Sequence, residues 1–343
     1  MTRRPRAVGR VLQQVTAFSR RADLFRPRDT VMVACSGGPD SVCLLHALAS
    51  LRRLLRISVV AFHFDHRLHA ASAEHAAYVR RQAAKLRVAF VVREAADRPP
   101  KGASVEAWAR TVRYAALSEA AVEAGADRLA LGHTMDDQAE TVLLGLARGG
   151  GLEAVAGMAP VATAPPLGLA AVRPLLETRR EETAAFCRSL GLRPRQDPAN
   201  ADPRFLRVRI RDRVLPALER ELDRGLVPTL ARTAEHVRAD AAFLEGLASE
   251  AAGSIVEIGE GEVRLHAASL VALPLPVASR VVRHGLRLAA ALGGQLFDDV
   301  EAAHVRAVLD LAAGRPKRRA DLPGALAAVR DREYVRLSRG EDA

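Results

Sequence analysis

The chain has 343 residues, which at about 150 residues per domain predicts two domains, each with a hydrophobic core of its own. Hydrophobic residues at 49% and charged residues at 27% exclude a disordered chain or a fibrous repeat. Lysine and arginine together number 51 against 40 acidic residues, a net charge of +11. This surplus favours a polyanionic partner such as nucleic acid, with a plain solubility charge as the alternative.

Nearly all of the basic residues are arginines, since the lysines are Lys85, Lys101 and Lys317 alone. Aromatic residues make up only 4% of the chain, so a platform that stacks many bases is not expected. Contacts to a nucleic acid would therefore come mainly from arginines, through phosphates and guanidinium stacking.

The cysteines, Cys35, Cys43 and Cys187, form neither a C-x-x-C pair nor an even set. This pattern predicts a reducing compartment, the cytoplasm, and no zinc or iron–sulfur site. The longest uncharged stretch, 154–172, approaches the length of a membrane span, but its glycines and prolines would break a helix. We expect a loop there and no membrane segment.

The first two hundred residues alternate between strand and helix patterns. A short amphipathic helix is expected first, because Val11, Val15 and Phe18 recur at helical spacing. Apolar runs of buried-strand length follow at 30–35, 57–63, 88–92, 128–132 and 171–176, and helical segments at 40–53, 72–86, 104–124, 136–148 and 178–190. The alternation predicts an α/β fold with a doubly wound parallel sheet, whose ligand site lies beyond the carboxyl ends of the strands.

The pattern changes after Pro216, so we place a domain boundary there, with 1–216 as the first domain and 217–343 as the second. The second domain is expected to contain a long helix over 228–254, a hairpin over 255–265 that turns at Gly259 and Gly261, helices near 277–292 and 298–313, and strands at 325–329 and 334–337. This smaller, helical α+β domain carries no recognisable catalytic motif. It therefore looks like a binding or docking module.

Directly after the first strand, the sequence reads Ser36-Gly37-Gly38-Pro39-Asp40-Ser41 and continues into a helix. Two glycines let the backbone approach an anion closely, and the helix N-terminus adds amide donors and a favourable dipole. The string lacks the G-K-[ST] of a Walker A loop. A phosphate cradle is predicted, and the alternative is a plain turn in which Ser41 caps the helix.

This string resembles the PP-loop of the N-type ATP pyrophosphatases, enzymes that cleave ATP between the α and β phosphates. The further segments are His63-Phe64-Asp65-His66-Arg67-Leu68 after the second strand, Gly132-His133-Thr134-Met135-Asp136-Asp137-Gln138-Ala139-Glu140-Thr141 after the fourth, Arg173-Pro174-Leu175-Leu176 in the fifth, and Asp197-Pro198-Ala199-Asn200 beyond it. Together they resemble the tRNA(Ile)-lysidine synthase family over about residues 28–218. An adenine nucleotide α-hydrolase-like fold is implied there, whereas the second domain is similar only in size, position and its 322–324 turn.

Members of that family use ATP and free lysine to convert the wobble cytidine of tRNA(Ile) into lysidine. Oxygen 2 of the cytidine attacks the α-phosphate, pyrophosphate leaves, and the lysine amine then displaces AMP at carbon 2. The resemblance therefore implies ATP and Mg²⁺ as cofactors and tRNA(Ile) and L-lysine as partners. The second domain would dock the tRNA.

The resemblance also assigns residues to the nucleotide. The ATP-binding set would be Ser36, Gly37, Gly38, Pro39, Asp40, Ser41, His63 and His133. Asp40, at the mouth of the cradle, is the natural carboxylate for Mg²⁺, which must offset the charge of the triphosphate. The implied catalytic set is Asp40, Arg113, Asp137 and Glu140.

Asp137 and Glu140 lie at i and i+3 on one helical face, and two carboxylates there suit an ammonium substrate. Acids favoured by the dipole of a solvated helix N-terminus are the alternative. Arg113 follows Arg110 at i+3 on the helix that begins near Ser104. A surface salt-bridge ladder is one interpretation of that pair, whereas the resemblance implies that Arg113 reaches the active site to neutralise phosphate.

The densest basic run lies between the two predicted domains and consists of Arg193, Arg195, Arg204, Arg207, Arg209, Arg211 and Arg213. It is either a solvated helix or an RNA-facing strip, and we expect Arg204, Arg207 and Arg211 to bind tRNA. Val208 stands where the family usually has asparagine, which leaves the local hydrogen-bond network in doubt. Gly150 is a second departure, at a place where a hydroxyl residue is more usual.

Two rival functions remain open on sequence grounds. One is a PP-loop tRNA cytidine thiolase, which would need cysteines for a cluster or persulfide and finds no C-x-x-C here. The other is a non-catalytic module that binds an adenine nucleotide. Retention of Asp40, Asp137 and Glu140 argues against that module, because nucleotide binding alone does not require an acidic pocket for lysine.

Overall fold

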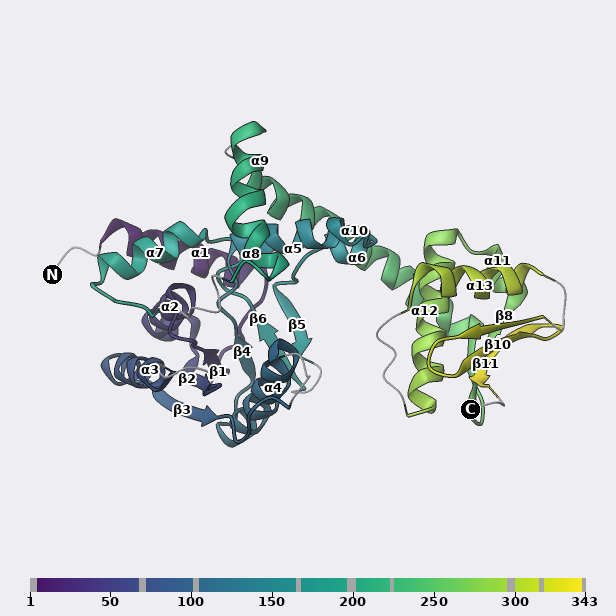
Figure 1. The fold of residues 1–343 in the computed structure, drawn as a ribbon, viewed down its shortest axis with the longest axis horizontal. Helices are drawn as coiled ribbons and strands as arrows, with labels where there is room; N and C mark the ends of the chain where they lie inside the picture. Colours follow the sequence, from purple (N-terminus) through teal and green to yellow (C-terminus); the bar gives the residue numbers. More distant parts are fainter. Residues whose placement is uncertain are drawn as a thin grey trace. The chain divides into compact units, whose positions relative to one another are not determined.

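The computed structural model describes residues 5–67, 72–100, 105–164, 168–195, 202–222, 225–294, 300–314 and 318–340. The chain divides into two compact units, Met1–Arg238 and Ala239–Ala343, and each is described by itself (Figure 1). Among the described residues, no helix is long and apolar enough to cross a membrane.

Within the described part of the first unit, six strands form one sheet in the order β3-β2-β1-β4-β6-β5. The strands are β1 (Thr30–Ala34), β2 (Ser58–Asp65), β3 (Ala89–Glu94), β4 (Arg128–Ala130), β5 (Val161–Ala164) and β6 (Leu169–Val172). Every neighbouring pair is parallel except β5 and β6. The α/β fold with a doubly wound sheet is confirmed, with one antiparallel strand at its edge.

The expected loop over 154–172 is wrong in its second half, because β5 and β6 pair there as a hairpin. Val161 pairs with Val172 and Ala164 with Leu169. The prolines and glycines correctly indicate turns, but an antiparallel edge strand of four residues fits between them, since an edge strand tolerates prolines nearby. The last parallel strand also ends at Val172, so the Arg173-Pro174-Leu175-Leu176 segment follows the strand rather than lying in it.

Helices cover both faces of the sheet. On one face, α1 (Arg6–Arg21), α2 (Pro39–Leu55), α3 (Ser72–Leu86) and α7 (Arg180–Ser189) bury a core around Val33, Leu45 and Phe186. The predicted amphipathic helix is confirmed, since the apolar stripe of α1 is buried in this core. On the other face, α4 (Val105–Glu123) buries Leu117 in a core with Met32 and Phe62 of the sheet. The cysteines are buried and free, all in the first core.

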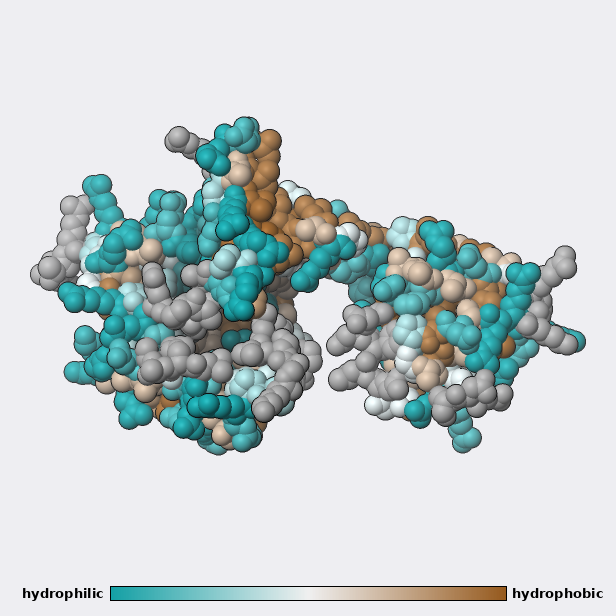
Figure 2. All heavy atoms as spheres, viewed as in Figure 1, coloured by the Kyte–Doolittle hydropathy of each residue, from teal (hydrophilic) through white to brown (hydrophobic). Residues whose placement is uncertain are grey.

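A smaller core joins the helices that follow the sheet. It contains Ala139 of α5 (Met135–Ala147), Ile210 of the π-helix η2 (Ile210–Val214), Leu215 of α9 (Leu215–Glu221) and Val227 of α10 (Leu226–Ile255). Because the start of α10 packs here, the compact unit extends to Arg238, beyond the boundary expected at Pro216. Figure 2 shows apolar side chains gathered over α9 and the start of α10, where Leu222 is among the exposed ones.

In the second unit, the described strands form an antiparallel sheet in the order β7-β8-β11-β10-β9. These are β7 (Val256–Ile258), β8 (Glu262–His266), β9 (Arg319–Leu322), β10 (Leu326–Arg330) and β11 (Tyr334–Arg339), with helices α11 (Ala267–Ala272), α12 (Leu275–Leu292) and α13 (Ala302–Ala313). Leu265, Leu286 and Leu337 share their core. The predicted α+β character and the hairpin at Gly259 and Gly261 are confirmed, whereas α11 and β9 were not predicted.

Candidate active site

The candidate site lies at the carboxyl edge of the parallel strands, where β1 and β4 are neighbours. The chain leaves β1 through α2 toward β2 on one side of the sheet, and β4 pairs with β1 on the other side, so the strand order reverses between them. Ligands of open α/β sheets bind at such a reversal. The loops that follow β1 and β4 carry the two motifs singled out from the sequence, and the fold brings them together.

The loop after β1 is shaped as the phosphate cradle requires. Gly37 has a φ of +93°, which a residue with a side chain rarely adopts, and Gly38 caps α2 with Pro39 as its first helical residue. Ser41 is therefore not the cap; its Oγ donates to the Gly38 carbonyl at 3.0 Å and lies 3.2 Å from the Ser36 Oγ. The first turn of a 17-residue helix thus points its dipole and amides toward the cradle.

Gly132, just after the end of β4, lies close against this loop. A Cβ built on it would lie 3.2 Å from both the Cα and the N of Ser41 and 3.3 Å from the carbonyl carbon of Asp40. Contacts this short are tighter than side chains normally make. A residue without a side chain is therefore needed here for the β4 motif to reach the cradle.

The histidines that follow the strands have different surroundings. His63 is buried, its Nδ1 lies 2.8 Å from the Cys35 carbonyl, and burial lowers its pKa. His133 has a pKa lowered to about 4, mainly by burial, with the charges of Arg173, Arg207 and Arg113 acting in the same direction. Its buried Nδ1 has no hydrogen-bond partner among the described residues. Both histidines are therefore neutral at pH 7, and His133 retains a ring nitrogen for a ligand.

Asp40 is the carboxylate of the cradle. Thr183 of α7 donates a hydrogen bond to its Oδ1, and the Nε of Arg180 lies 3.7 Å from its Oδ2. Burial raises the pKa of Asp40 to about 6, although both of these partners oppose the rise. A further cation beside Asp40 would therefore stabilise the charged form of its side chain.

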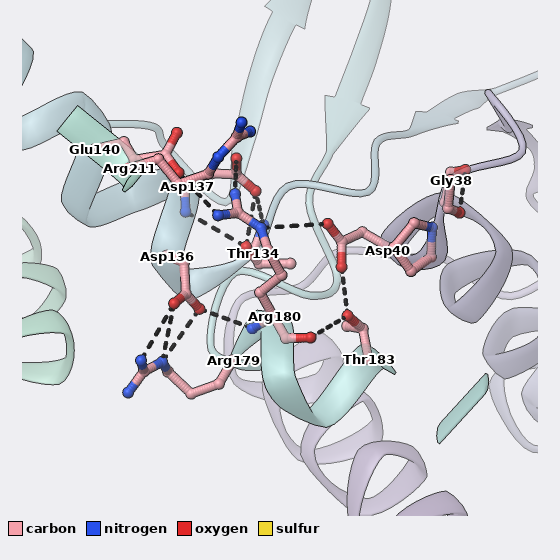
Figure 3. A network of polar contacts seen from close by, with 12 residues as sticks. Gly38, Asp40, Thr134, Asp136, Asp137, Glu140, Arg179, Arg180, Thr183 and Arg211 are labelled. Atoms are coloured by element: carbon pink, nitrogen blue, oxygen red, sulfur yellow. Dashed lines mark hydrogen bonds and ion pairs between the residues drawn. The ribbon is translucent and has the colours of Figure 1, made fainter. Parts of the chain in front are cut away.

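The predicted acid pair on α5 is brought together, and it faces arginines. Asp137 Oδ2 accepts hydrogen bonds from the N–H and Oγ1 of Thr134, closing a capping box at the start of α5. Arg180 donates to Asp137 Oδ1 at 2.8 Å and to Glu140 Oε1 at 2.9 Å. Glu140 is only 1% exposed. Figure 3 shows Arg180 lying between Asp40 on one side and the α5 acids on the other.

A second arginine completes this acidic cluster. Arg207 of α8 (Leu206–Arg209) donates from Nε to Glu140 Oε2 at 2.8 Å, and its Nη2 lies 3.5 Å from Asp137 Oδ1. Burial disfavours the charge of Asp137, but Arg180, the Thr134 donors and Arg207 outweigh it, so its pKa is lowered. Asp137 is therefore an anion at neutral pH.

Of the other predicted RNA-binding arginines, Arg204 lies on the surface, whereas the side chain of Arg211 is only 28% exposed. The side chain of Arg204 is 86% exposed and pairs with Asp202 at 2.6 Å. Arg211 pairs with the neighbouring Asp212 at 2.9 Å and is drawn beside Glu140 in Figure 3. Arg207 points at the α5 acids.

Arg113 belongs to the electrostatic surroundings of the site, since its charge helps to lower the pKa of His133. The predicted Asp197-Pro198-Ala199-Asn200 segment and Ser104 lie outside the described residues, as does the side chain of Arg110. The Val208 departure is buried in the first unit.

The residues that join the motifs were not predicted from the sequence. Arg180 and Thr183 link Asp40 to the α5 acids, and Asp136 binds Arg179 and the backbone N–H of Arg180. Gln138 of the same motif exchanges hydrogen bonds with the backbone of Met158, at 3.0 and 2.7 Å. One signal was available: adjacent arginines follow the last parallel strand, at the edge where ligands bind.

Comparison with known proteins agrees with this geometry. The PP-loop domain family matches residues 9–218. The tRNA(Ile)-lysidine synthase of Rhodococcus jostii (strain RHA1) is 42% identical over 287 residues, covering 84% of this chain and 81% of its own length. That of Salinispora tropica is 42% identical over 302 residues, covering 88% of each chain.

Among solved structures, the U34-tRNA thiolase NcsA from Methanococcus maripaludis with its [4Fe-4S] cluster matches with a TM-score of 0.56 and 17% identity, covering 68% of this chain and 79% of that one. At this identity the likeness concerns the fold alone. From its sequence relatives and its PP-loop domain, the chain belongs to the tRNA(Ile)-lysidine synthase family.

Proposed function

We propose that the protein joins free L-lysine to carbon 2 of the wobble cytidine of tRNA(Ile), with ATP cleaved to AMP and pyrophosphate. The observation that carries the proposal is the meeting of the phosphate cradle and the α5 acids at one edge of the sheet, where Arg180 links Asp40 to Asp137 and Glu140. Membership of the lysidine synthase family supports the same reaction. Each half-reaction then has its own part of the site.

The cradle serves the first half-reaction, in which cytidine oxygen 2 attacks the α-phosphate. The amides at the start of α2 and the positive end of its dipole hold phosphate oxygens, and Gly37 allows the close approach of the backbone. Arg113 adds positive charge on the side of His133. These groups orient the α-phosphate and stabilise the charge that develops as pyrophosphate leaves.

The donor set fits Mg²⁺, which proteins commonly hold through one or two carboxylates together with substrate phosphates. Asp40 would hold it, since this carboxylate lies at the cradle and lacks a closer cation than Arg180 at 3.7 Å. When bound, the ion supplies positive charge that offsets the triphosphate.

The α5 acids serve the second half-reaction, in which the lysine amine displaces AMP. Asp137 and Glu140 present two carboxylates on one helical face, within reach of a cation that already bridges them in this structure. An ammonium group needs such anionic partners when it leaves water. Holding lysine there places its amine at the same sheet edge as the activated cytidine.

We further propose that the tRNA contacts the arginine strip through Arg204, Arg207 and Arg211 and docks on the second unit, and that the protein works in the cytoplasm. The strip supports this, because phosphate contacts by arginine dominate affinity for RNA. The second unit supports it only in that it is a folded module separate from the first.

The test is a transcript of tRNA(Ile) with cytidine at the wobble position, mixed with the protein and ATP, with and without lysine. We expect pyrophosphate release with this transcript and, when lysine is present, a nucleoside heavier by one lysyl group on digestion and mass spectrometry. A transcript with uridine at that position is the matched control and should give neither. Sulfur incorporation would instead indicate a thiolase, and ATP binding without pyrophosphate release a nucleotide-binding module.

A further inference from the structure

The two α5 acids are matched in charge by two arginines in this structure, and Asp40, which Arg180 also contacts at 3.7 Å, is left for the cation of the cradle. Asp137 and Glu140 contribute two negative charges, and Arg180 and Arg207 contribute two positive ones. All four carboxylate oxygens receive donors of this chain: Glu140 Oε1 from Arg180, Glu140 Oε2 from Arg207, Asp137 Oδ1 from Arg180 and Asp137 Oδ2 from Thr134. An ammonium that enters a neutral cluster gains little Coulomb energy, so one arginine must leave for the acids to bind it.

Arg180 is fixed more firmly than Arg207. Its guanidinium contacts Asp40, Asp137 and Glu140, its backbone N–H donates to Asp136 at 2.7 Å, and its side chain is 28% exposed. Arg207 makes one short bond to a carboxylate, at 2.8 Å, and its Nη2 makes two longer contacts to Asp137, at 3.3 Å to the backbone carbonyl and 3.5 Å to Oδ1; its side chain is 42% exposed. Removing Arg207 therefore breaks one short ion pair, where removing Arg180 would break two, and it leaves one net negative charge on the α5 acids, which a single ammonium neutralises.

Arg207 also has neighbours that fit another anion. Arg204 and Arg209 lie on the same short segment, and the side chain of Arg204 is almost fully exposed. The chain directly after α8 is the π-helical turn Ile210–Val214, a rare backbone form that is frequent at functional sites. RNA phosphates that bind this strip would offer Arg207 a partner in place of Glu140.

We propose that Arg207 is a positioning residue that exchanges Glu140 for an RNA phosphate when tRNA binds, and thereby opens the carboxylate pair to the lysine ammonium. This inference rests on the proposed function. It makes lysine binding dependent on bound RNA, and by linkage the two ligands strengthen each other by the same factor. Lysine then enters the site mainly when there is a cytidine for it to modify.

The test measures lysine affinity by calorimetry on the full chain with a non-hydrolysable ATP analogue, with and without a saturating anticodon stem-loop of tRNA(Ile). For the unaltered protein, we expect the RNA to tighten lysine binding by about fivefold or more, as allosteric couplings typically do. In Arg207→Gln, lysine should bind equally well with and without RNA, at an affinity close to that of the RNA-bound unaltered protein. In Arg207→Lys, which retains the charge, part of the coupling should return.

Arg204→Gln is the matched control from the same strip. It should weaken RNA binding, yet at saturating RNA it should retain the full effect of RNA on lysine affinity, because Arg204 pairs with Asp202 and not with the α5 acids. Full coupling in Arg207→Gln would overturn the proposal. So would lysine affinity independent of RNA in an unaltered protein that forms lysidine, whereas a protein that forms no lysidine would refute the proposed function instead.

Discussion

Asp40 sits in surroundings that disfavour its charge. Burial raises the pKa of this carboxyl to about 6, above the value of 3.8 for an exposed aspartate. Because the folded state holds the proton more tightly than the unfolded chain, protonation stabilises the fold at low pH, and this contribution is lost as the pH rises through about 6. At neutral pH the native protein therefore carries an unfavourable carboxylate, ready for a cation.

Asp40→Asn should consequently make the protein more stable at pH 7.5, by about 1–2 kcal/mol, while removing activity. The asparagine oxygen can still accept the Thr183 hydrogen bond, and the burial cost of the charge, which outweighs the lost ion pair with Arg180 at 3.7 Å, disappears. Urea unfolding at pH 7.5 and pH 4.5 measures the effect, which should be clearly smaller at the lower pH, where Asp40 is protonated in the native state and begins to be protonated in the unfolded chain. Asp212→Asn, at an exposed carboxylate, should change little at either pH, and an equal gain in both variants would contradict the explanation.

Glu140 is a second carboxylate whose charge we expect to matter, in this case for binding lysine. Glu140→Gln should therefore impair the lysine half-reaction and spare the ATP half-reaction. A hydrogen bond to a charged group is worth roughly 1.5–3 kcal/mol, so the apparent KM for lysine should rise by one to two orders of magnitude. ATP binding and pyrophosphate release should persist, because the cradle belongs to a different loop. Steady-state kinetics with varied lysine and varied ATP measure the split.

The control for that variant is Glu181→Gln, which removes an exposed acid next to Arg180 in sequence and should leave both KM values nearly unchanged. A Glu140→Gln protein with weakened ATP binding and an ordinary KM for lysine would instead assign the acid pair to the nucleotide.

At the scale of elements, the approach of β4 to α2 sets the geometry of the cradle. Gly132→Ala places a methyl group 3.2 Å from the backbone of Ser41, so the loop must shift by a few tenths of an ångström. We expect the KM for ATP to rise about tenfold or more, since small misplacements of a binding site have large costs. Gly9→Ala is the matched control, because nothing lies within 4 Å of a Cβ on this helical glycine. An unchanged KM for ATP in Gly132→Ala would mean that the cradle absorbs the shift.

The elements differ in how well the sequence predicts them. The central parallel strands are nearly continuous apolar runs because both of their faces are buried, so β1, β2 and β4 could be found from sequence. The edge strand β5 contains alanines and a threonine between turn residues, and only its pairing with β6 makes it a strand. Arg180 was not predicted as a site residue for a similar reason, since its ion pairs are with positions 40, 137 and 140, which lie far from it along the chain.

The candidate site likewise contains residues that the sequence predicts and residues that only the tertiary structure reveals. The cradle and the α5 acids are local motifs, so spacing and resemblance could identify them. Which cations face those acids is a property of the tertiary structure, because Arg180 comes from α7 and Arg207 from α8. For the same reason, Arg207 was expected on RNA phosphates and is found on Glu140.

For the molecule as a whole, the net charge of +11 should make tRNA binding strongly dependent on salt. Each arginine that contacts a phosphate contributes about 0.7–0.9 to the slope of log affinity against log salt. Arg204→Gln should lower the measured slope by that amount, in filter-binding or anisotropy titrations from 50 to 200 mM salt. Arg53→Gln, at the exposed end of α2 farthest from the cradle, tests whether the loss is specific to the strip, and an unchanged slope in Arg204→Gln would make that arginine an ordinary solvated side chain.

The buried thiols of Cys35 and Cys187 lie at the cradle, so their reactivity reports how often the cradle separates from α7. Cys187 Sγ lies 3.5 Å from the Pro39 carbonyl and Cys35 Sγ lies 3.7 Å from the Ser41 Oγ, and burial raises their pKa values to about 12 and about 11. An alkylating reagent needs an accessible thiolate, so it reacts only in molecules whose cradle has transiently separated from α7. The labelling rate at pH 8 should therefore fall when ATP is added, and mass spectrometry of Cys35 and Cys187 peptides turns that fall into a measure of how far the nucleotide holds these elements closed.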